Sequence, residues 1–201
     1  MHQSMEAPMI RIATQNDLPQ MLEIYAPYVL NTAYSFEYAP PTLEEFSQRF
    51  AKYTAQCPWL VWEEAGSVVG YAYGSLPFER AAYAWCAEVS IYIAPQMQGK
   101  GIGKKLYAAV EEILWRQGYQ IIYALITSEN ENSLRFHEQV GYSYCAQFPD
   151  CGIKFGRRLG VIWMQKTSKT VEIPSSMPVP WRFVVEDDRK LMEVLASLPL
   201  F

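Results

Sequence analysis

Hydrophobic and polar residues alternate with two different periods along the chain, and each period predicts one type of element. Runs with apolar residues at every second position are typical of strands, and they are found at 9–13, 59–64, 68–73, 83–93, 120–127, 142–151 and 157–165. Apolar residues spaced by about 3.6 positions predict helices. These begin near Leu18, after Thr42, at Ile102 and near Asn132. The order favours a mixed α/β fold with a mostly antiparallel central sheet flanked by helices.

Local signals support several of these boundaries. Thr42 followed by Glu45 is a capping-box pattern that predicts the start of a helix. Gly66-Ser67 between two β-rich runs predicts a hairpin turn. The aromatic segment 34–38 lies between the first two helices. It is interpreted either as a loop that contacts a ligand or as a surface loop fixed by aromatic packing.

The character of the chain changes after Lys166. Prolines at 174, 178 and 180 exclude regular pairing, so a linker is expected over 167–185. An amphipathic helix is then expected over 186–201, with Leu191, Val194, Leu195 and Leu198 on one face. The sequence therefore predicts one domain over 9–166 with two appended segments. The apolar face of the helix would be buried on its own domain or on a second subunit, which would make a homodimer.

Composition excludes several classes of partner. The chain has 201 residues, 50% of them hydrophobic, and its net charge of −4 makes a nucleic-acid partner unexpected. No apolar run is long enough for a membrane span, and residues 1–6 do not resemble a signal peptide, so a cytoplasmic location is expected. Four cysteines without a C-x-x-C pair and two histidines predict no metal site.

A glycine-rich stretch at 98–105 separates a strand from a helix. Glycines at a helix N-terminus expose backbone amides, and the neighbouring lysines add positive charge, so a phosphate-bearing ligand is expected there. The spacing of Gly99 and Gly103 does not fit a P-loop, and Lys104 stands where a dinucleotide fingerprint needs glycine. A tight turn without a ligand is the alternative interpretation.

Two motifs resemble the GNAT superfamily of acetyl-coenzyme A dependent N-acetyltransferases. Gln98-x-x-Gly101-x-Gly103 resembles its pyrophosphate loop, and Asn130-x-x-Ser133 with His137, then Gly141-Tyr142, resembles its downstream segment. The resemblance covers about four fifths of the chain, and it implies the GNAT fold and acetyl-CoA as cosubstrate. The cofactor-binding residues that it implies are Ile91, Tyr92, Ile93, Gln98, Gly99, Lys100, Gly101, Ile102, Gly103, Asn130 and Ser133.

A narrower resemblance is to the phosphinothricin and methionine sulfoximine acetyltransferase branch. It rests on Asn31-Thr32, Phe36, Pro58–Val61, Arg80-x-Ala82-Tyr83, Glu88-x-Ser90-x-Tyr92 and Leu134-x-x-His137-Glu138. Members of this branch acetylate the α-amino group of small amino acids or their analogues. The chain departs from the pattern at Arg158 and Gly160, where the branch has tryptophan and aspartate, so the acceptor amine stays open. Protein or peptide N-acetylation and a non-catalytic acyl-CoA binding module are the alternatives.

Candidate catalytic residues follow from the same comparison. Glu88 lies on an otherwise apolar strand, which favours a raised carboxyl pKa and a role as general base; a strand glutamate that faces solvent or pairs with Arg80 is the structural alternative. His137 stands where the superfamily often has tyrosine. It could donate a proton to sulfur, bind the cofactor or pack beneath it.

The acceptor side is assigned on chemical character. Arg80 suits a substrate carboxylate because its guanidinium can bind both oxygens. Phe36 and Tyr83 are expected to wall the substrate pocket.

Overall fold

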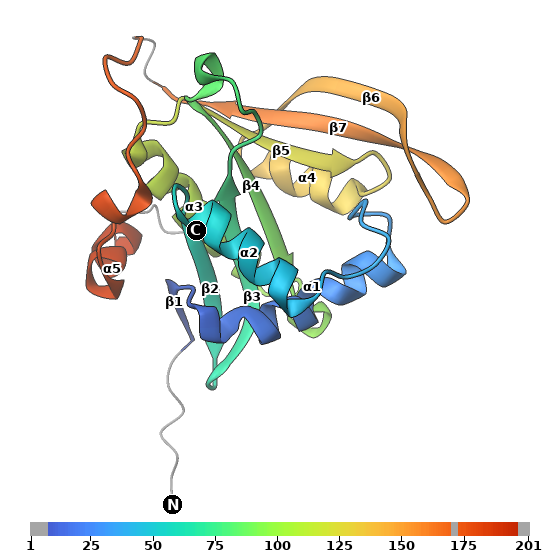
Figure 1. Cartoon of the computed structure of the whole chain (residues 1–201), viewed down its shortest axis with the longest axis horizontal. Helices are drawn as coiled ribbons and strands as arrows, with labels where there is room; N and C mark the ends of the chain where they lie inside the picture. The colour runs from blue at the N-terminus through green and yellow to red at the C-terminus, as the bar shows by residue number, and fades with distance from the viewer. Residues whose placement is uncertain (1–7, 170–172, 197–201) are drawn as a thin grey trace, which may run out of the picture.

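The fold is taken from a computed structural model, which describes residues 8–169 and 173–196. Seven strands form one sheet in the order β1-β2-β3-β4-β5-β7-β6 (Figure 1). The strands are β1 Met9–Ile12, β2 Trp59–Glu64, β3 Ser67–Ser75, β4 Cys86–Ile93, β5 Ile121–Thr127, β6 Ser143–Lys154 and β7 Arg157–Thr167. Among the strands of the described residues, only β4 and β5 pair in parallel. The mixed, mostly antiparallel α/β sheet expected from the sequence is confirmed.

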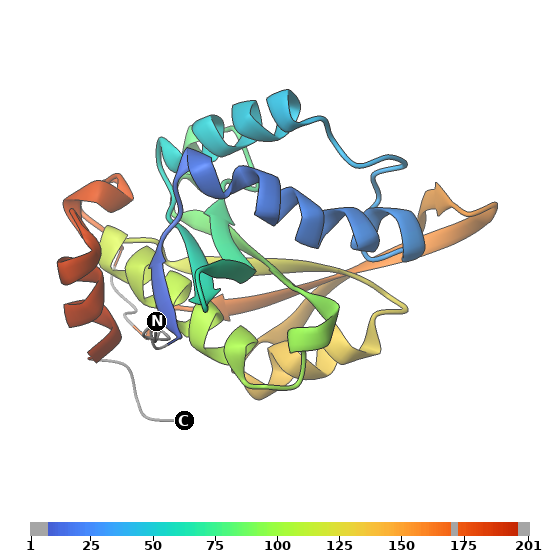
Figure 2. The same ribbon diagram turned by 90° about the horizontal axis from the view of Figure 1, so that it is seen from below.

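Helices cover both faces of the sheet. On one face lie α1 Leu18–Asn31 and α2 Leu43–Thr54, and on the other lie α3 Ile102–Gln117 and α4 Glu131–Gln139, as Figure 2 shows. Alternate residues of each strand pack against opposite layers. On β3, for example, Tyr71 and Tyr73 belong to the core under α1 and α2, whereas Ala72 belongs to the core under α3.

Local sequence chemistry explains where the elements begin and turn. The hydroxyl of Thr42 accepts a hydrogen bond from the Glu45 amide at 3.2 Å, and the Thr42 amide donates to Glu45 Oε2 at 2.7 Å, so the capping box is confirmed. Ala65 and Gly66 have φ values of 51° and 74°, the left-handed pair that a tight β2–β3 hairpin requires. The strand expected from position 83 begins at Cys86, because 81–83 form a 3-10 turn.

The central pair of strands separates along its length. The pairing of β4 with β5 comprises Cys86–Glu88 opposite Ile121–Tyr123. Beyond this point β4 continues to Ile93 and β5 to Thr127 without further register between them among the described residues. The divergence opens the sheet at its centre, between the two helical layers.

The end of the chain packs on its own domain. Trp181 lies in the segment expected to be a linker, begins a 3-10 turn over Trp181–Phe183 and is only 4% exposed. Its indole N–H donates to the Thr54 carbonyl at 2.9 Å. Helix α5, Asp188–Ala196, places Leu191 and Val194 in the core shared with α3.

The sequence left two alternatives for the apolar face of this helix, its own domain or a second subunit. The structure shows it buried on its own domain. Leu198 lies outside the described residues, and the division of the chain at 166 and 185 stays a prediction. None of the helices in the described part of the chain is long and apolar enough to cross a membrane.

Candidate active site

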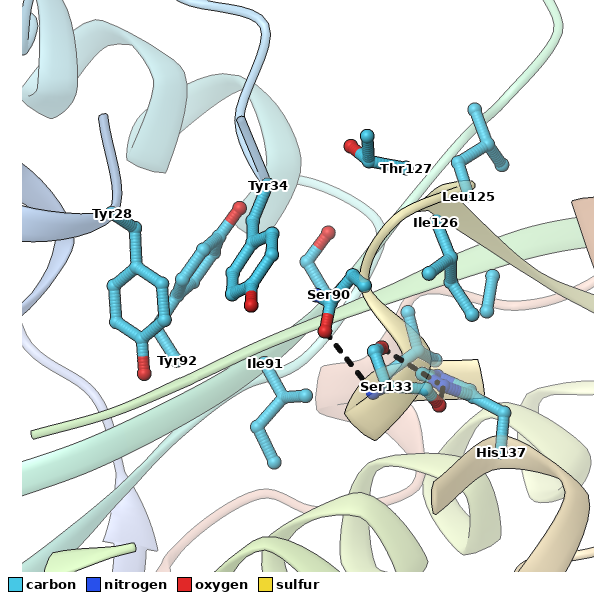
Figure 3. A pocket seen from close by; sticks show the side chains of 13 residues that line it. Tyr28, Tyr34, Ser90, Ile91, Tyr92, Leu125, Ile126, Thr127, Ser133 and His137 are labelled. Atoms are coloured by element: carbon cyan, nitrogen blue, oxygen red, sulfur yellow. Dashed lines mark hydrogen bonds between the residues drawn. The ribbon is translucent and has the colours of Figure 1, made fainter. Parts of the chain in front are cut away.

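A pocket occupies the opening between β4 and β5 (Figure 3). It contains about 510 Å³ of empty space, part of it open to solvent. Both diverging strands line it, together with the C-terminal part of α1, the adjoining loop and the first turns of α4. The lining residues are Tyr28, Tyr34, Val89, Ser90, Ile91, Tyr92, Ala124, Leu125, Ile126, Thr127, Asn130, Ser133 and His137.

The backbone of β4 presents hydrogen-bonding groups to this pocket. The Ala94 amide donates to Val69 of β3 at 2.9 Å, whereas the Ile93 carbonyl accepts from the Tyr28 hydroxyl at 2.6 Å, away from β3. Because successive residues of a strand direct their backbone groups to opposite sides, Ile91 also faces the opening. The edge of β4 at Ile91 can therefore pair with an extended ligand, whereas the amide and carbonyl of Ile93 both bond to the Tyr28 hydroxyl.

The glycine-rich stretch forms the start of α3 close to this edge. Gly99 and Gly101 have φ values of 76° and 79°, and Gly101 is the N-cap of the helix. A Cβ atom at either position would meet no atom within 4 Å, so backbone conformation and not space requires glycine there. The amides of residues 102–104 lack intrahelical acceptors by helix geometry, and Lys100 is exposed beside them. This arrangement suits a pyrophosphate group.

Gln98 connects the loop to the pocket. Its side-chain amide donates to the Tyr28 hydroxyl at 2.8 Å, and Tyr28 in turn contacts Ile93. Sequence reasoning singled out Gln98 but missed Tyr28, and it named Tyr34 only as part of the aromatic segment 34–38 that could contact a ligand. Both come from the end of α1 and its loop, and no spacing in the sequence links them to β4.

Glu88 lies where β4 and β5 begin to diverge. It is opposite Ser75 of β3 and Tyr123 of β5, and it shares a sheet face with Ser90 and Tyr92 of the pocket. Burial raises the pKa of Glu88 to about 7. The described residues include no ion-pair partner for Glu88, so the alternative of a pair with Arg80 is not what the structure shows. A carboxylate in this state can accept a proton near neutral pH.

His137 lies beneath the pocket and is 3% exposed. Its Nδ1 is 2.7 Å from the Ser133 carbonyl, and its Nε2 is 3.0 Å from the Tyr107 hydroxyl. The network assigns the proton to Nδ1, which donates to Ser133, while Nε2 accepts from Tyr107. Burial lowers the pKa of His137 to about 4, so the ring is neutral at pH 7.

The first turn of α4 completes this wall. Asn130 is the N-cap residue, and its side-chain oxygen accepts from the Ser133 amide at 3.1 Å. Asn130 and Ser133, which were both predicted as cofactor contacts, therefore line the opening.

An aromatic cluster lies on the Glu88 face of the sheet. Tyr83 packs on Phe78 with ring centroids 4.6 Å apart, and Phe78 in turn contacts Tyr123 at 5.9 Å and Trp163 at 5.6 Å. Because Tyr123 is the register partner of Glu88, this cluster borders the candidate base. Sequence reasoning found Tyr83 but missed the other three aromatic residues. They come from separate parts of the chain, Phe78 from the loop after β3, Tyr123 from β5 and Trp163 from β7.

The two remaining acceptor candidates occupy different positions. Arg80 is exposed and precedes the 3-10 turn 81–83 as its N-cap. Phe36 lies against Gly152 of β6, where a Cβ atom would come within 2.3 Å of its ring. The structure thus brings Tyr83 to the cluster near Glu88, whereas Phe36 comes from the α1–α2 loop, rests on the β6–β7 hairpin and is not among the residues that line the pocket.

Comparison with known proteins identifies the family of this fold and site. The chain matches the acetyltransferase (GNAT) domain over residues 10–163 and therefore belongs to the GNAT family. Phosphinothricin N-acetyltransferase of Alcaligenes faecalis is 36% identical over 162 residues, which cover 78% of this chain and 81% of that one. The L-methionine sulfoximine/L-methionine sulfone acetyltransferase of Salmonella typhimurium is 36% identical over 160 residues, covering 78% and 92%.

Solved structures agree with the sequence relatives. A GNAT superfamily phosphinothricin acetyltransferase from Sinorhizobium meliloti in complex with AcCoA superposes with a TM-score of 0.80 at 31% identity, covering 85% of this chain and 95% of that one. The yncA putative acetyltransferase from Salmonella typhimurium, with its cofactor acetyl-CoA, gives 0.79 at 32% identity, covering 85% and 100%. The resemblance to the phosphinothricin and methionine sulfoximine acetyltransferase branch, which the sequence motifs indicated, is thus confirmed.

Proposed function

We propose that this enzyme transfers the acetyl group of acetyl-CoA directly to the primary amine of a small amino-acid-like acceptor of the phosphinothricin or methionine sulfoximine type. The observation that carries the proposal is Glu88, a half-buried carboxyl with a pKa raised to about 7 where the two central strands diverge. The relatives named for acetylation of such substrates support the same acceptor class.

The residues present fit acetyl-CoA. The amides of the first turn of α3 and the left-handed Gly99 and Gly101 suit its pyrophosphate, and the free edge of β4 at Ile91 suits its extended pantetheine arm. Asn130 would donate to the same arm from the opposite wall. Acetyl-CoA supplies the activated acetyl thioester.

In the proposed mechanism, Glu88 accepts one proton from the ammonium form of the substrate, directly or through water. The neutral amine then attacks the acetyl carbon, the carbon–sulfur bond breaks, and the second amine proton passes to the leaving sulfur. A backbone amide of β4 facing the opening stabilises the oxyanion. Because His137 is neutral and its Nδ1–H is engaged, we assign it to holding the first turn of α4, not to protonating sulfur.

For the acceptor, we propose that Arg80 binds the carboxylate of the substrate. Tyr83 and the aromatic cluster around Phe78 would contact its side chain, with Phe36 closing the opposite side. Arg80 is exposed and belongs to the same short turn as Tyr83, so its long side chain can reach toward the cluster.

The direct test is to incubate the protein with acetyl-CoA and a panel of primary amines and to follow free thiol. Methionine sulfoximine, methionine sulfone, phosphinothricin and common L-amino acids form the panel, with N-terminal peptides as the alternative class. We expect thiol release with a member of the small-molecule set. Release with peptides alone would favour the peptide acceptor, and tight acetyl-CoA binding without any turnover would favour a non-catalytic module.

A further inference from the structure

Lys154 is a buried lysine that the proposed mechanism does not use. It ends strand β6 and is only 2% exposed. Its ammonium group donates hydrogen bonds to the carbonyls of Val29 and Ser35, both at 2.7 Å. None of the described residues provides a carboxylate within ion-pair distance. Lys154 therefore contacts the carbonyl groups of two residues far away in the sequence, and its charge has no ion-pair partner in the part of the chain that the structure describes.

The first of these contacts lies at a helix end. Val29 is in the last turn of α1, where carbonyl groups lack intrahelical donors and the helix dipole is negative. A lysine ammonium satisfies such a carbonyl and is favoured by the dipole. Lys154 thus ties the C-terminal end of α1 to β6.

The second contact fixes the loop that follows α1. Lys154 holds the Ser35 carbonyl, and the hydroxyl of Thr127 on β5 donates to the Ala33 carbonyl at 2.7 Å. These two carbonyls flank Tyr34, whose side chain lines the pocket (Figure 3). The backbone on either side of Tyr34 is therefore anchored to the strands that build the site.

Further along the loop, two more side chains rest on the same stretch of β6. Phe36 covers Gly152 so closely that a Cβ atom at that position would clash with its ring. The Tyr38 hydroxyl donates to the Ile153 carbonyl at 2.5 Å. Residues 152–154 thus support the loop 32–38, and Lys154 is the buried residue among them.

We propose that Lys154 is a positioning residue for acetyl transfer, because its two hydrogen bonds fix the loop 32–38 and thereby hold Tyr34 at the pocket and Phe36 at the acceptor side. This inference rests on the proposed function of the pocket. An unpaired buried ammonium is costly compared with an apolar side chain of similar length. A purely space-filling role would therefore be served better by methionine.

The test compares Lys154→Met, which keeps the length and removes the donors, with Lys52→Met on the exposed surface of α2 as the matched control. Both KM values, kcat and hydrogen–deuterium exchange of the segment 29–38 are measured. In Lys154→Met we expect the acceptor KM to rise roughly tenfold or more, since small misplacements of substrate-positioning groups are costly. We expect the acetyl-CoA KM to stay within about twofold, because the phosphate loop is untouched.

The exchange measurement separates this proposal from the proposed function. Faster hydrogen–deuterium exchange in 29–38, with exchange in α3 unchanged, would show that Lys154 fixes the loop. This result would hold even if the acceptor were different from the one proposed. Unchanged exchange, or equal rises in both KM values, would overturn the positioning role. If Lys154→Met does not fold, Thr127→Val, which removes the neighbouring tie to Ala33, takes its place, and Lys154→Gln, which keeps uncharged N–H donors, should lie closer to the wild type.

Discussion

Glu88 sets the expected pH dependence of the reaction. Its pKa of about 7 means that the basic form accumulates above neutral pH, so kcat/KM for the acceptor should fall as pH decreases through 7. Glu88→Gln removes the base, and kcat should drop by roughly 10²- to 10⁴-fold while the KM for acetyl-CoA stays unchanged. Steady-state pH profiles check both statements, with Glu23→Gln on the exposed face of α1 as the control. A retained inflection near pH 7 in Glu88→Gln would remove the residue from this role.

The same shift predicts a cost in stability. The pKa of Glu88 is raised from 4.5 to about 7 by burial, so the folded state holds the proton more tightly than the unfolded state. The stability of the wild type should therefore fall as pH rises from about 4.5 through 7. Glu88→Gln should raise the free energy of unfolding by on the order of 1–3 kcal/mol at pH 8 and have little effect near pH 4.5. Urea denaturation at the two pH values measures this, and an equal gain at both would contradict a charge-based cause.

His137 should not titrate near neutral pH. Its pKa of about 4 follows from burial, and its two nitrogens are already engaged by Ser133 and Tyr107. Since the chain has only two histidines, their imidazole NMR signals can be followed individually. We expect one set of signals to stay constant from pH 5 to 8 with the proton on Nδ1. A midpoint near 6.5 would restore His137 as a candidate acid.

Single residues differ in how far the sequence could predict them. Glu88, Gln98 and Asn130 were recognised because each belongs to a spaced motif, and all three lie at or beside the pocket. Tyr28 and Lys154 were missed because their roles come from tertiary contacts with Ile93 and Ser35. Neither contact leaves a pattern in the local sequence.

Among the elements, the start of α3 depends on glycine for its backbone conformation. Gly101→Ala places a side chain at a φ of 79°, and Gly66→Ala does the same at 74° in the β2–β3 turn; neither Cβ atom would meet a neighbour. Each should cost about 1 kcal/mol of stability through strain. Only Gly101→Ala should also raise the KM for acetyl-CoA, because it disturbs the amides proposed to bind pyrophosphate. Similar KM values in the two variants would argue against the phosphate loop.

Strands and helices were predictable because their signals are local. The β2–β3 hairpin and the capping box at Thr42 follow from turn and cap chemistry within a few residues. The separation of β4 from β5 leaves no such local signal. It depends on how two strands with a helix between them diverge after Glu88, and hydrophobic periodicity carries no information about that.

At the scale of the whole molecule, residues 173–196, here called the C-terminal tail, are part of the fold and lie beyond the family match, which ends at residue 163. The Asp188 carboxylate accepts from the Ile12 amide at 3.1 Å, so the tail caps the exposed edge of β1. Such edges otherwise favour association with other strands. The tail therefore completes the side of the molecule opposite the β6–β7 hairpin (Figure 1).

Trp181 anchors this tail, and its removal should destabilise the protein without changing its chemistry. Trp181→Ala deletes a 4% exposed indole and its bond to Thr54, and we expect a loss of about 3–5 kcal/mol in unfolding free energy. Phe183→Ala in the same turn removes a ring that is 77% exposed and should cost less than about 0.5 kcal/mol. At 25 °C the fraction of Trp181→Ala that remains folded should keep the wild-type KM values, because the indole packs away from the opening between β4 and β5. Denaturant unfolding and sedimentation velocity test both variants. Equal stability losses would show that the tail does not depend on this anchor, and altered KM values would show that the tail reaches the site.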